Sequence, residues 1–228
     1  ISGIIPVGEV LARARALGAS LTEYLAAHYM LSLAEVRASA HDGARARGPS
    51  VIRLEVPVDM RQFFPSKTLR NFALYVSPEI DLRMGAYSIE QVVRRVHHSL
   101  GMQVDARELG REMGRNVRAE RHPLVRAMPL VVKDSVRALA YRRLGERTYS
   151  GVLSNLGRIA GPAAVLPHIE SFDFLLNPSY AMKPNCSVLS FRDSLRVNFG
   201  SIIASRELER RFFTRLAADG VRVLVTER

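Results

Sequence analysis

The residues best suited to chemistry stand at the end of a β-type stretch in the second half of the chain. Residues 148–157 read TYSGVLSNLG, in which strand-forming residues give way to Ser154 and Asn155, with Gly157 just beyond. A hydroxyl and an amide at a strand end lie where the backbone turns and small ligands can approach. We predict that Ser154 contributes to an active site as a hydrogen-bond donor. The structural alternative is a strand end whose side chains only satisfy backbone groups.

The proton acceptor that such a site needs is not evident in the sequence. No HxxxD pattern occurs, and the Gly-x-Ser-x-Gly turn of hydrolases does not surround Ser154. His97 and His98 are adjacent within a predicted helix, so their side chains diverge and cannot hold one metal as an i, i+4 pair can. We expect no metal site. The other histidines are treated as surface or structural residues: His28, His41, His122 and His168.

The composition limits the class of protein. The 228 residues are 47% hydrophobic and have a net charge of +11, from 30 Arg and 3 Lys. The basic residues are dispersed and tryptophan is absent, whereas nucleic-acid binders concentrate basic charge beside stacking aromatics, so we expect no nucleic-acid partner. Cys186 is the only cysteine, which excludes an internal disulfide and fits a reducing, cytoplasmic location. We expect its thiol to be buried in a strand.

Hydrophobic periodicity and capping residues predict a single α/β domain. Ser20 with Glu23 and Ser88 with Gln91 form capping boxes that begin two helices. The predicted helices are 8–17, 21–39, 88–100, 105–119, 129–144 and 205–218, the fifth beginning at Pro129. The predicted strands are 51–58, 71–76, 148–154, 169–176, 184–191, 194–200 and 221–226, with a tight turn at Asp193–Ser194.

One part of the chain concentrates positive charge. Residues 107–147 contain eleven basic and five acidic residues, a net charge of +6, and the helix at 129–143 has an apolar and a basic side. Such a helix could rest on anionic lipid or on the carrier of an acyl acceptor, or pack on its own sheet. No segment approaches the roughly 20 consecutive apolar residues of a transmembrane helix.

Three short motifs, in this order, resemble a family of acyltransferases. PVDMR at 57–61, followed ten residues later by Asn71-Phe72, resembles the PVxxR…NF segment of two-domain acyltransferases related to condensation domains and wax-ester synthases. FFPSKTLRNF at 63–72 looks like the bacterial alcohol acetyltransferase branch. SNLG at 154–157 is similar to the strand-end motif of chloramphenicol acetyltransferase-like and dihydrolipoamide acyltransferase enzymes, whose serine hydroxyl is the oxyanion donor. The order and spacing of elements agree over most of the chain.

The resemblance implies two similar α/β halves, each a mixed sheet flanked by helices, with the active site in a tunnel between them. Residues 1–228 look like the second, C-terminal half, as a single domain. The chain begins ISGIIP, without methionine or signal-peptide features, so we interpret it as part of a longer protein. Two-domain relatives carry HxxxD in the first half, and the stretch at 197–203, where single-domain relatives carry their catalytic histidine, contains none. We therefore expect this chain to be inactive alone.

The resemblance also implies roles for individual residues. Ser154 would be the catalytic oxyanion donor in acyl transfer from acyl-CoA, the co-substrate, to an alcohol, with no tightly bound cofactor. The candidate substrate- or cofactor-binding residues are Asn155, Gly157, Lys67, Arg61 and Asn71. Lys67 would meet the phosphates of coenzyme A as a point charge, or be an ordinary exposed lysine. Arg61 and Asn71 would line the tunnel mouth, or tie loops together by hydrogen bonds.

Two alternatives to a coenzyme A-dependent alcohol O-acyltransferase stay open. One is a non-catalytic binding or interaction module of the same fold, and the other is a condensation-like domain that takes its acyl group from a carrier protein's phosphopantetheine. If the chain is half of an enzyme, its main partner is the N-terminal domain of the same protein. The apolar wall that faced that domain would then be exposed, and large exposed patches associate, so we expect the isolated chain to form a homodimer.

Overall fold

The computed structural model describes residues 1–39, 50–144, 149–177 and 184–227 of the chain. Its strands are Ser2–Pro6 (β1), Val51–Asp59 (β2), Ala73–Val76 (β3), Glu79–Asp81 (β4), Gly151–Arg158 (β5), Asn185–Phe191 (β6), Ser194–Gly200 (β7) and Leu224–Thr226 (β8). Its α-helices are Val7–Ala16 (α1), Leu21–Ser39 (α2), Ile89–Gln103 (α3), Ala106–Arg121 (α4), Pro123–Ala127 (α5), Leu130–Leu144 (α6) and Glu207–Ala218 (α7).

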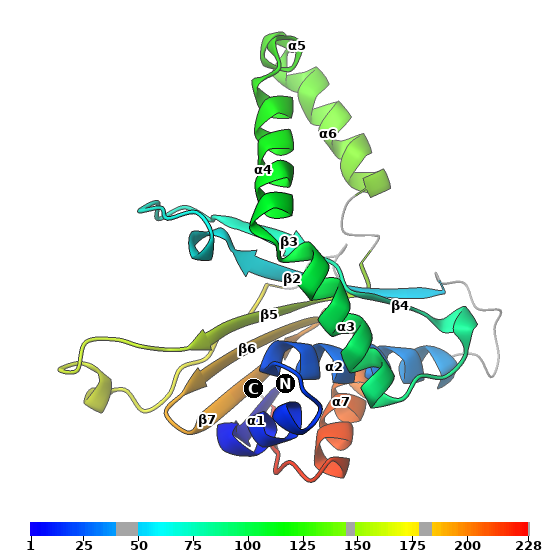
Figure 1. The fold of residues 1–228 in the computed structure, drawn as a ribbon, viewed down its shortest axis with the longest axis vertical. Helices are drawn as coiled ribbons and strands as arrows, with labels where there is room; N and C mark the ends of the chain where they lie inside the picture. The colour runs from blue at the N-terminus through cyan, green and yellow to red at the C-terminus, as the bar shows by residue number, and fades with distance from the viewer. Residues whose placement is uncertain (40–49, 145–148, 178–183, 228) are drawn as a thin grey trace.

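The strands form one mixed sheet that divides near its middle. The order is β3-β2-β5-β6-β7-β1-β8, with β4 also paired to β2. β5 runs parallel to β2 and to β6, whereas the other pairs are antiparallel. The β2–β5 pairing has only two register positions, Leu54 with Gly151 and Glu55 with Val152. Beyond them β2 pairs with β3 and β5 stays with β6, so the two parts of the sheet diverge (Figure 1).

Helix α2 is the centre of the hydrophobic core. All of its residues from Glu23 to Leu33 are buried, as expected of a helix that is enclosed by its neighbours rather than lying on the surface. It packs in one cluster with α1, α3, α7 and the apolar side chains of one face of the sheet, among them Leu153, Val188 and Val197. The helices therefore cover this face, which we call the helix face.

Helices α4, α5 and α6 form an arm that projects from this core (Figure 1). Leu109 is the only buried residue of α4, and α5 has none. The described side chains of α6 are also not buried. The break between α5 and α6 falls at Met128 and Pro129, where the sequence predicts a helix start, because proline cannot donate the backbone hydrogen bond of a helix interior.

The predicted helices are confirmed, with small differences at their ends. Both capping boxes are present: Ser20 N donates to Glu23 Oε2 at 2.6 Å, and Ser88 N donates to Gln91 Oε1 at 2.9 Å. The last helix begins at Glu207 rather than at residue 205. Among the strands, β1 and β4 are missing from the sequence-based prediction, β5 lies three to four residues later than predicted, β8 begins at Leu224, and the β6–β7 turn is Arg192–Asp193.

The prediction of a strand at 169–176 is wrong. These residues form no strand, although the side chains from Ser171 onward alternate between exposed and half-buried. Phe172 packs edge-to-face on Phe191, with ring centroids 4.9 Å apart. The Phe174 carbonyl accepts hydrogen bonds from the Ser187 and Asn198 side chains, so side chains of the sheet take the place of a neighbouring strand. The segment lies against the sheet instead of joining it.

Gly151 is a position where the core has no room for a side chain. A Cβ atom there would collide with the Tyr29 hydroxyl, which donates a hydrogen bond to Pro184 O. We expect Gly151→Ala to lower the free energy of unfolding by about 1–3 kcal/mol, measured by urea denaturation. Gly8→Ala in α1 is the control, because a Cβ at Gly8 meets no atom within 4 Å. Equal effects of the two substitutions would contradict this account of the core.

Candidate functional site

Ser154 lies on β5, on the face of the sheet opposite the helix face. Its neighbour Leu153 is fully buried in the helix-face core, and successive side chains of a strand point to opposite faces. Ser154 is only 8% exposed. Its hydroxyl makes no hydrogen bond to any residue that the structure describes. The Oγ atom is not one of the fully buried, unpartnered side-chain atoms, so it is accessible to solvent or to a ligand.

Ser154 is the first member of a row of polar side chains that crosses this face. Its register partner on β6 is Ser187, whose partner on β7 is Asn198. Asn198 pairs in turn with Ser2 on β1, and Ser2 pairs with Thr226 on β8. Because register partners on neighbouring strands share a face, five adjacent strands each contribute one member. We call these five residues the polar row.

The segment 171–177 covers the middle of the polar row. Ser187 Oγ donates to Phe174 O at 2.6 Å, and Asn198 Nδ2 donates to the same carbonyl at 3.0 Å. Asn185, two residues earlier on β6, donates from Nδ2 to Asn177 O at 3.0 Å. The Oδ1 atoms of Asn185 and Asn198 are buried without a partner among the described residues. The face that carries Ser154 therefore also holds two unsatisfied acceptors.

The other residues of the SNLG motif shape the end of β5. Asn155 Nδ2 donates to Thr22 Oγ1 on α2 at 3.1 Å, and Asn155 Oδ1 accepts from Gly157 N at 2.8 Å. Gly157 has a φ of +75°, a conformation that favours glycine. Both ends of the Asn155 amide thus hold the strand end in place. This arrangement leaves the Ser154 hydroxyl as the unpaired polar group of the motif.

The loop between β2 and β3 holds the three remaining candidates. The Arg61 guanidinium donates to Asp59 Oδ1 at 2.9 Å and to the carbonyls of Thr68 and Arg70 at 3.0 and 2.8 Å, so it ties the loop together. Lys67 and Asn71 are exposed. The loop follows the C-terminal end of β2, at the same sheet edge as the end of the parallel strand β5. Among the described residues, no hydrogen bond or ion pair joins this loop to Ser154, Asn155 or Gly157.

The histidines in the part of the chain that the structure describes do not place a base beside Ser154. His28 is 1% exposed within α2, on the helix face, and its Nε2 lies 3.1 Å from Asp219 Oδ2. Sequence alone did not indicate this partner. Burial lowers the pKa of His28 to about 4, against the opposing effect of Asp219. His97 Nδ1 lies 3.0 Å from Glu23 Oε1. The remaining described histidines are exposed at His98, His122 and His168, and His41 lies outside the described residues.

The sequence analysis missed two kinds of residue on the face of Ser154: polar residues of β6 and β7, and a charged residue of β2. Ser187 and Asn198 alternate with apolar residues in β6 and β7, which reads as an ordinary solvent-facing side until the register of the strands is known. Glu55 pairs with Val152, so its carboxylate lies on the face of Ser154, and it is 6% exposed. The sequence signal that could have revealed Glu55 is a charged residue within the apolar run 51–58. Cys186, in contrast, is a fully buried thiol of β6, as predicted, and burial raises its pKa.

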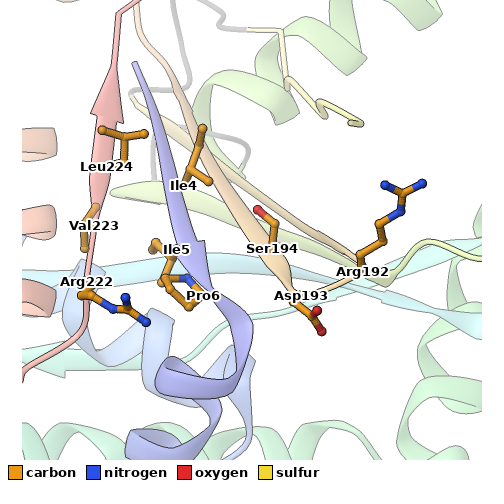
Figure 2. Close-up of a pocket in the computed structure, with 9 residues that line it drawn as sticks. All are labelled: Ile4, Ile5, Pro6, Arg192, Asp193, Ser194, Arg222, Val223 and Leu224. Carbon is orange, nitrogen blue, oxygen red and sulfur yellow. The ribbon is translucent and has the colours of Figure 1, made fainter. Parts of the chain in front are cut away.

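An open groove of about 550 Å³ lies along β1, β8 and the β6–β7 turn (Figure 2). In Figure 2, Ile4 lies between Leu224 of β8 and Ser194 of β7. Arg222 at this groove pairs with Glu9, and Arg192 stacks on a phenylalanine ring 5.0 Å away. The groove contains none of the predicted site residues. It is lined by Ile4, Ile5, Pro6, Arg192, Asp193, Ser194, Arg222, Val223 and Leu224.

The described parts of the chain contain neither a cluster of metal ligands nor a helix that could span a membrane. No three side chains of His, Cys, Asp or Glu gather there as a metal site would require. None of the helices described is both long and apolar enough to cross a bilayer.

Comparison with known proteins identifies the fold. No protein-family model matches the sequence, and none of the curated proteins matches it. Among solved structures, TRI3 trichothecene 15-O-acetyltransferase from Fusarium sporotrichioides is 14% identical, with a TM-score of 0.57 over 93% of this chain and 45% of that one. The first condensation domain of the CDA synthetase is 17% identical, with a TM-score of 0.54 over 99% of this chain and 48% of that one.

These likenesses establish the fold and confirm the predicted fold class. The mixed sheet with its helices is shared with condensation domains and with an acetyltransferase. The chain spans a little under half the length of the two structures compared. At this level of identity the likeness does not extend to substrates.

The hydrogen bonds to Phe174 give a test of how the polar row holds segment 171–177. We expect Ser187→Ala combined with Asn198→Ala to speed chymotrypsin cleavage at Phe172 or Phe174 roughly tenfold or more, because two partly buried hydrogen bonds of about 1 kcal/mol each are lost. Ser190→Ala is the control on the same strand, since its hydroxyl binds Gly157 O instead. Unchanged cleavage in the double variant would show that other contacts hold the segment.

Proposed function

We propose that this chain forms one half of an acyltransferase active site and that Ser154 is its oxyanion donor. Attack of an alcohol on a thioester moves negative charge onto the carbonyl oxygen in the transition state. A preorganised hydrogen-bond donor at that point contributes about 2.7–4 kcal/mol. The observation that carries the proposal is the nearly buried, unpartnered hydroxyl of Ser154, which lies beyond the last β2–β5 pair in a fold shared with an acetyltransferase.

The general base would come from a second domain of the same protein. An alcohol is a poor nucleophile at neutral pH and needs a group that removes its proton. The sequence contains no HxxxD, and the buried His28 lies on the helix face, away from Ser154. The two solved structures compared above are about twice as long as the chain, which supports a second domain. On this proposal the chain is inactive alone.

Coenzyme A is proposed as the carrier of the acyl group. Lys67 is exposed on the β2–β3 loop and is free to meet a phosphate, whereas the Arg61 guanidinium is engaged with its own loop. A carrier protein's phosphopantetheine is the second candidate, favoured by the likeness to condensation domains. Both donors present the same thioester, so the role of Ser154 is the same for each.

Kinetics of the full-length protein test the role of Ser154. We expect Ser154→Ala to lower kcat about 10²–10³-fold with little change in the KM for acetyl-CoA, because only a transition-state interaction is lost. The measurement is thiol release with a panel of alcohols. Ser190→Ala should leave both constants unchanged, and Lys67→Ala should raise the KM for acetyl-CoA alone.

Two outcomes would contradict the proposal. An unchanged kcat for Ser154→Ala would remove this hydroxyl from the mechanism, and thiol release by the isolated chain would show that it needs no second domain. Replacing acetyl-CoA by an acetylated carrier protein identifies the donor. Turnover with the carrier protein alone would favour the condensation-like alternative.

The homodimer predicted for the isolated chain has a candidate surface at the end of the sheet. β8 is the last strand, and its Leu224 and Val225 are 62% and 48% exposed beside the groove along β1. We expect light scattering to give a mass that rises from 25.4 kDa toward twice that value with concentration, and Leu224→Ser to weaken the association. A clean monomer at high concentration would refute the dimer.

A further inference from the structure

The end of the arm exposes large apolar side chains that no described part of the chain covers. Leu124 in α5 is 72% exposed, and Leu130 and Val131 at the start of α6 are 70% and 79% exposed. Figure 1 shows this end of the arm far from the sheet and its helix layer. We call these three residues the arm tip. A cluster of this kind on a soluble domain commonly marks an interaction site.

Basic side chains surround the arm tip. Arg121 ends α4, Arg126 lies in α5, and Lys133 lies in the first turn of α6. None of the ion pairs among the described residues involves these three side chains, so their charge is not neutralised locally. The arm as a whole, residues 106–144, contains ten basic and four acidic residues, a net charge of +6. Its surroundings therefore favour an anionic partner.

The geometry of the tip favours a lipid surface over a protein helix. At the tip, Leu130, Val131 and Val132 are consecutive, so they point about 100° apart around α6 and form no single stripe there. The exposed stripe of Val132, Val136 and Leu139 runs along α6 away from the tip. When the end of the arm enters the boundary between headgroups and acyl chains, all three consecutive side chains meet an apolar environment, whichever way they point. Basic residues set just behind the apolar ones then lie at the level of the headgroups.

We propose that the arm tip binds an anionic membrane surface, with Leu124, Leu130 and Val131 at the acyl boundary and Arg121, Arg126 and Lys133 against the headgroups. Each basic residue near an anionic surface strengthens binding about fivefold. The apolar residues contribute in proportion to the area that they bury. This binding site is independent of Ser154 and of the proposed acyl transfer.

The absence of tryptophan from the sequence allows a direct test. Leu130→Trp introduces a single tryptophan at the arm tip, and Leu69→Trp places one at a fully exposed loop residue outside the arm. With vesicles of phosphatidylcholine and phosphatidylglycerol, we expect the emission of Leu130→Trp, and not of Leu69→Trp, to shift to the blue. The shift should weaken with phosphatidylcholine alone and in roughly 1 M salt, where charges are screened within about 3 Å.

Charge variants separate the contributions. Arg121→Gln with Arg126→Gln should weaken vesicle co-sedimentation about fivefold for each charge removed, whereas Arg70→Gln, an exposed arginine outside the arm, should not. An unshifted Leu130→Trp emission on anionic vesicles would overturn the proposal. A blue shift that grows with protein concentration in the absence of lipid would also overturn it, because a second copy would then cover the tip.

Discussion

The burial of α2 against the sheet determines where the candidate site lies. The helix is enclosed over most of its length, and the sheet residues that pack with it occupy alternate positions of β5, β6 and β7. Because strand side chains alternate, fixing Leu153, Val188 and Val197 toward the helices turns their neighbours to the other face. This packing turns the side chains of Ser154, Ser187 and Asn198 away from the helices. No polar contact is needed to explain that orientation.

The two faces of the sheet therefore serve different purposes. One face is an apolar core that provides stability, and the other has a buried polar row whose middle members hold segment 171–177. Ser154 stands at the end of that row, on the strand that loses its β2 neighbour. This hydroxyl is only slightly exposed and has no hydrogen-bond partner among the described residues, so it is available to donate to a charge that develops beside it.

The likeness to known structures establishes the fold without selecting a reaction. An O-acetyltransferase and condensation domains share the arrangement of this sheet and its helices. The arm is a separate feature, because it adds little to the core and its apolar end faces away from it. Substrate chemistry and the attachment to a surface can thus reside in different parts of one chain.

The helices and their ends could be predicted from the sequence because their signals are local. The capping boxes at Ser20 and Ser88 and the break at Pro129 act within a few residues, and each is found where it was expected. The segment 169–176 has the alternation of a strand, yet its carbonyl at Phe174 bonds to side chains from β6 and β7. Whether this segment forms a strand therefore depends on residues that are distant in the sequence, and a local pattern holds no information about them.

From the sequence we predict that a strand ends at Ser154 and that no HxxxD accompanies it, but β5 continues to Arg158 and carries Ser154 near its middle. The folded structure adds that Asn155 bonds to Thr22 and Gly157, that Ser154 has no partner among the described residues, and that Ser187, Asn198 and Glu55 share its face. The physical reason is strand register: it sets which side chains are neighbours, and it is established by packing between segments that lie far apart in the chain.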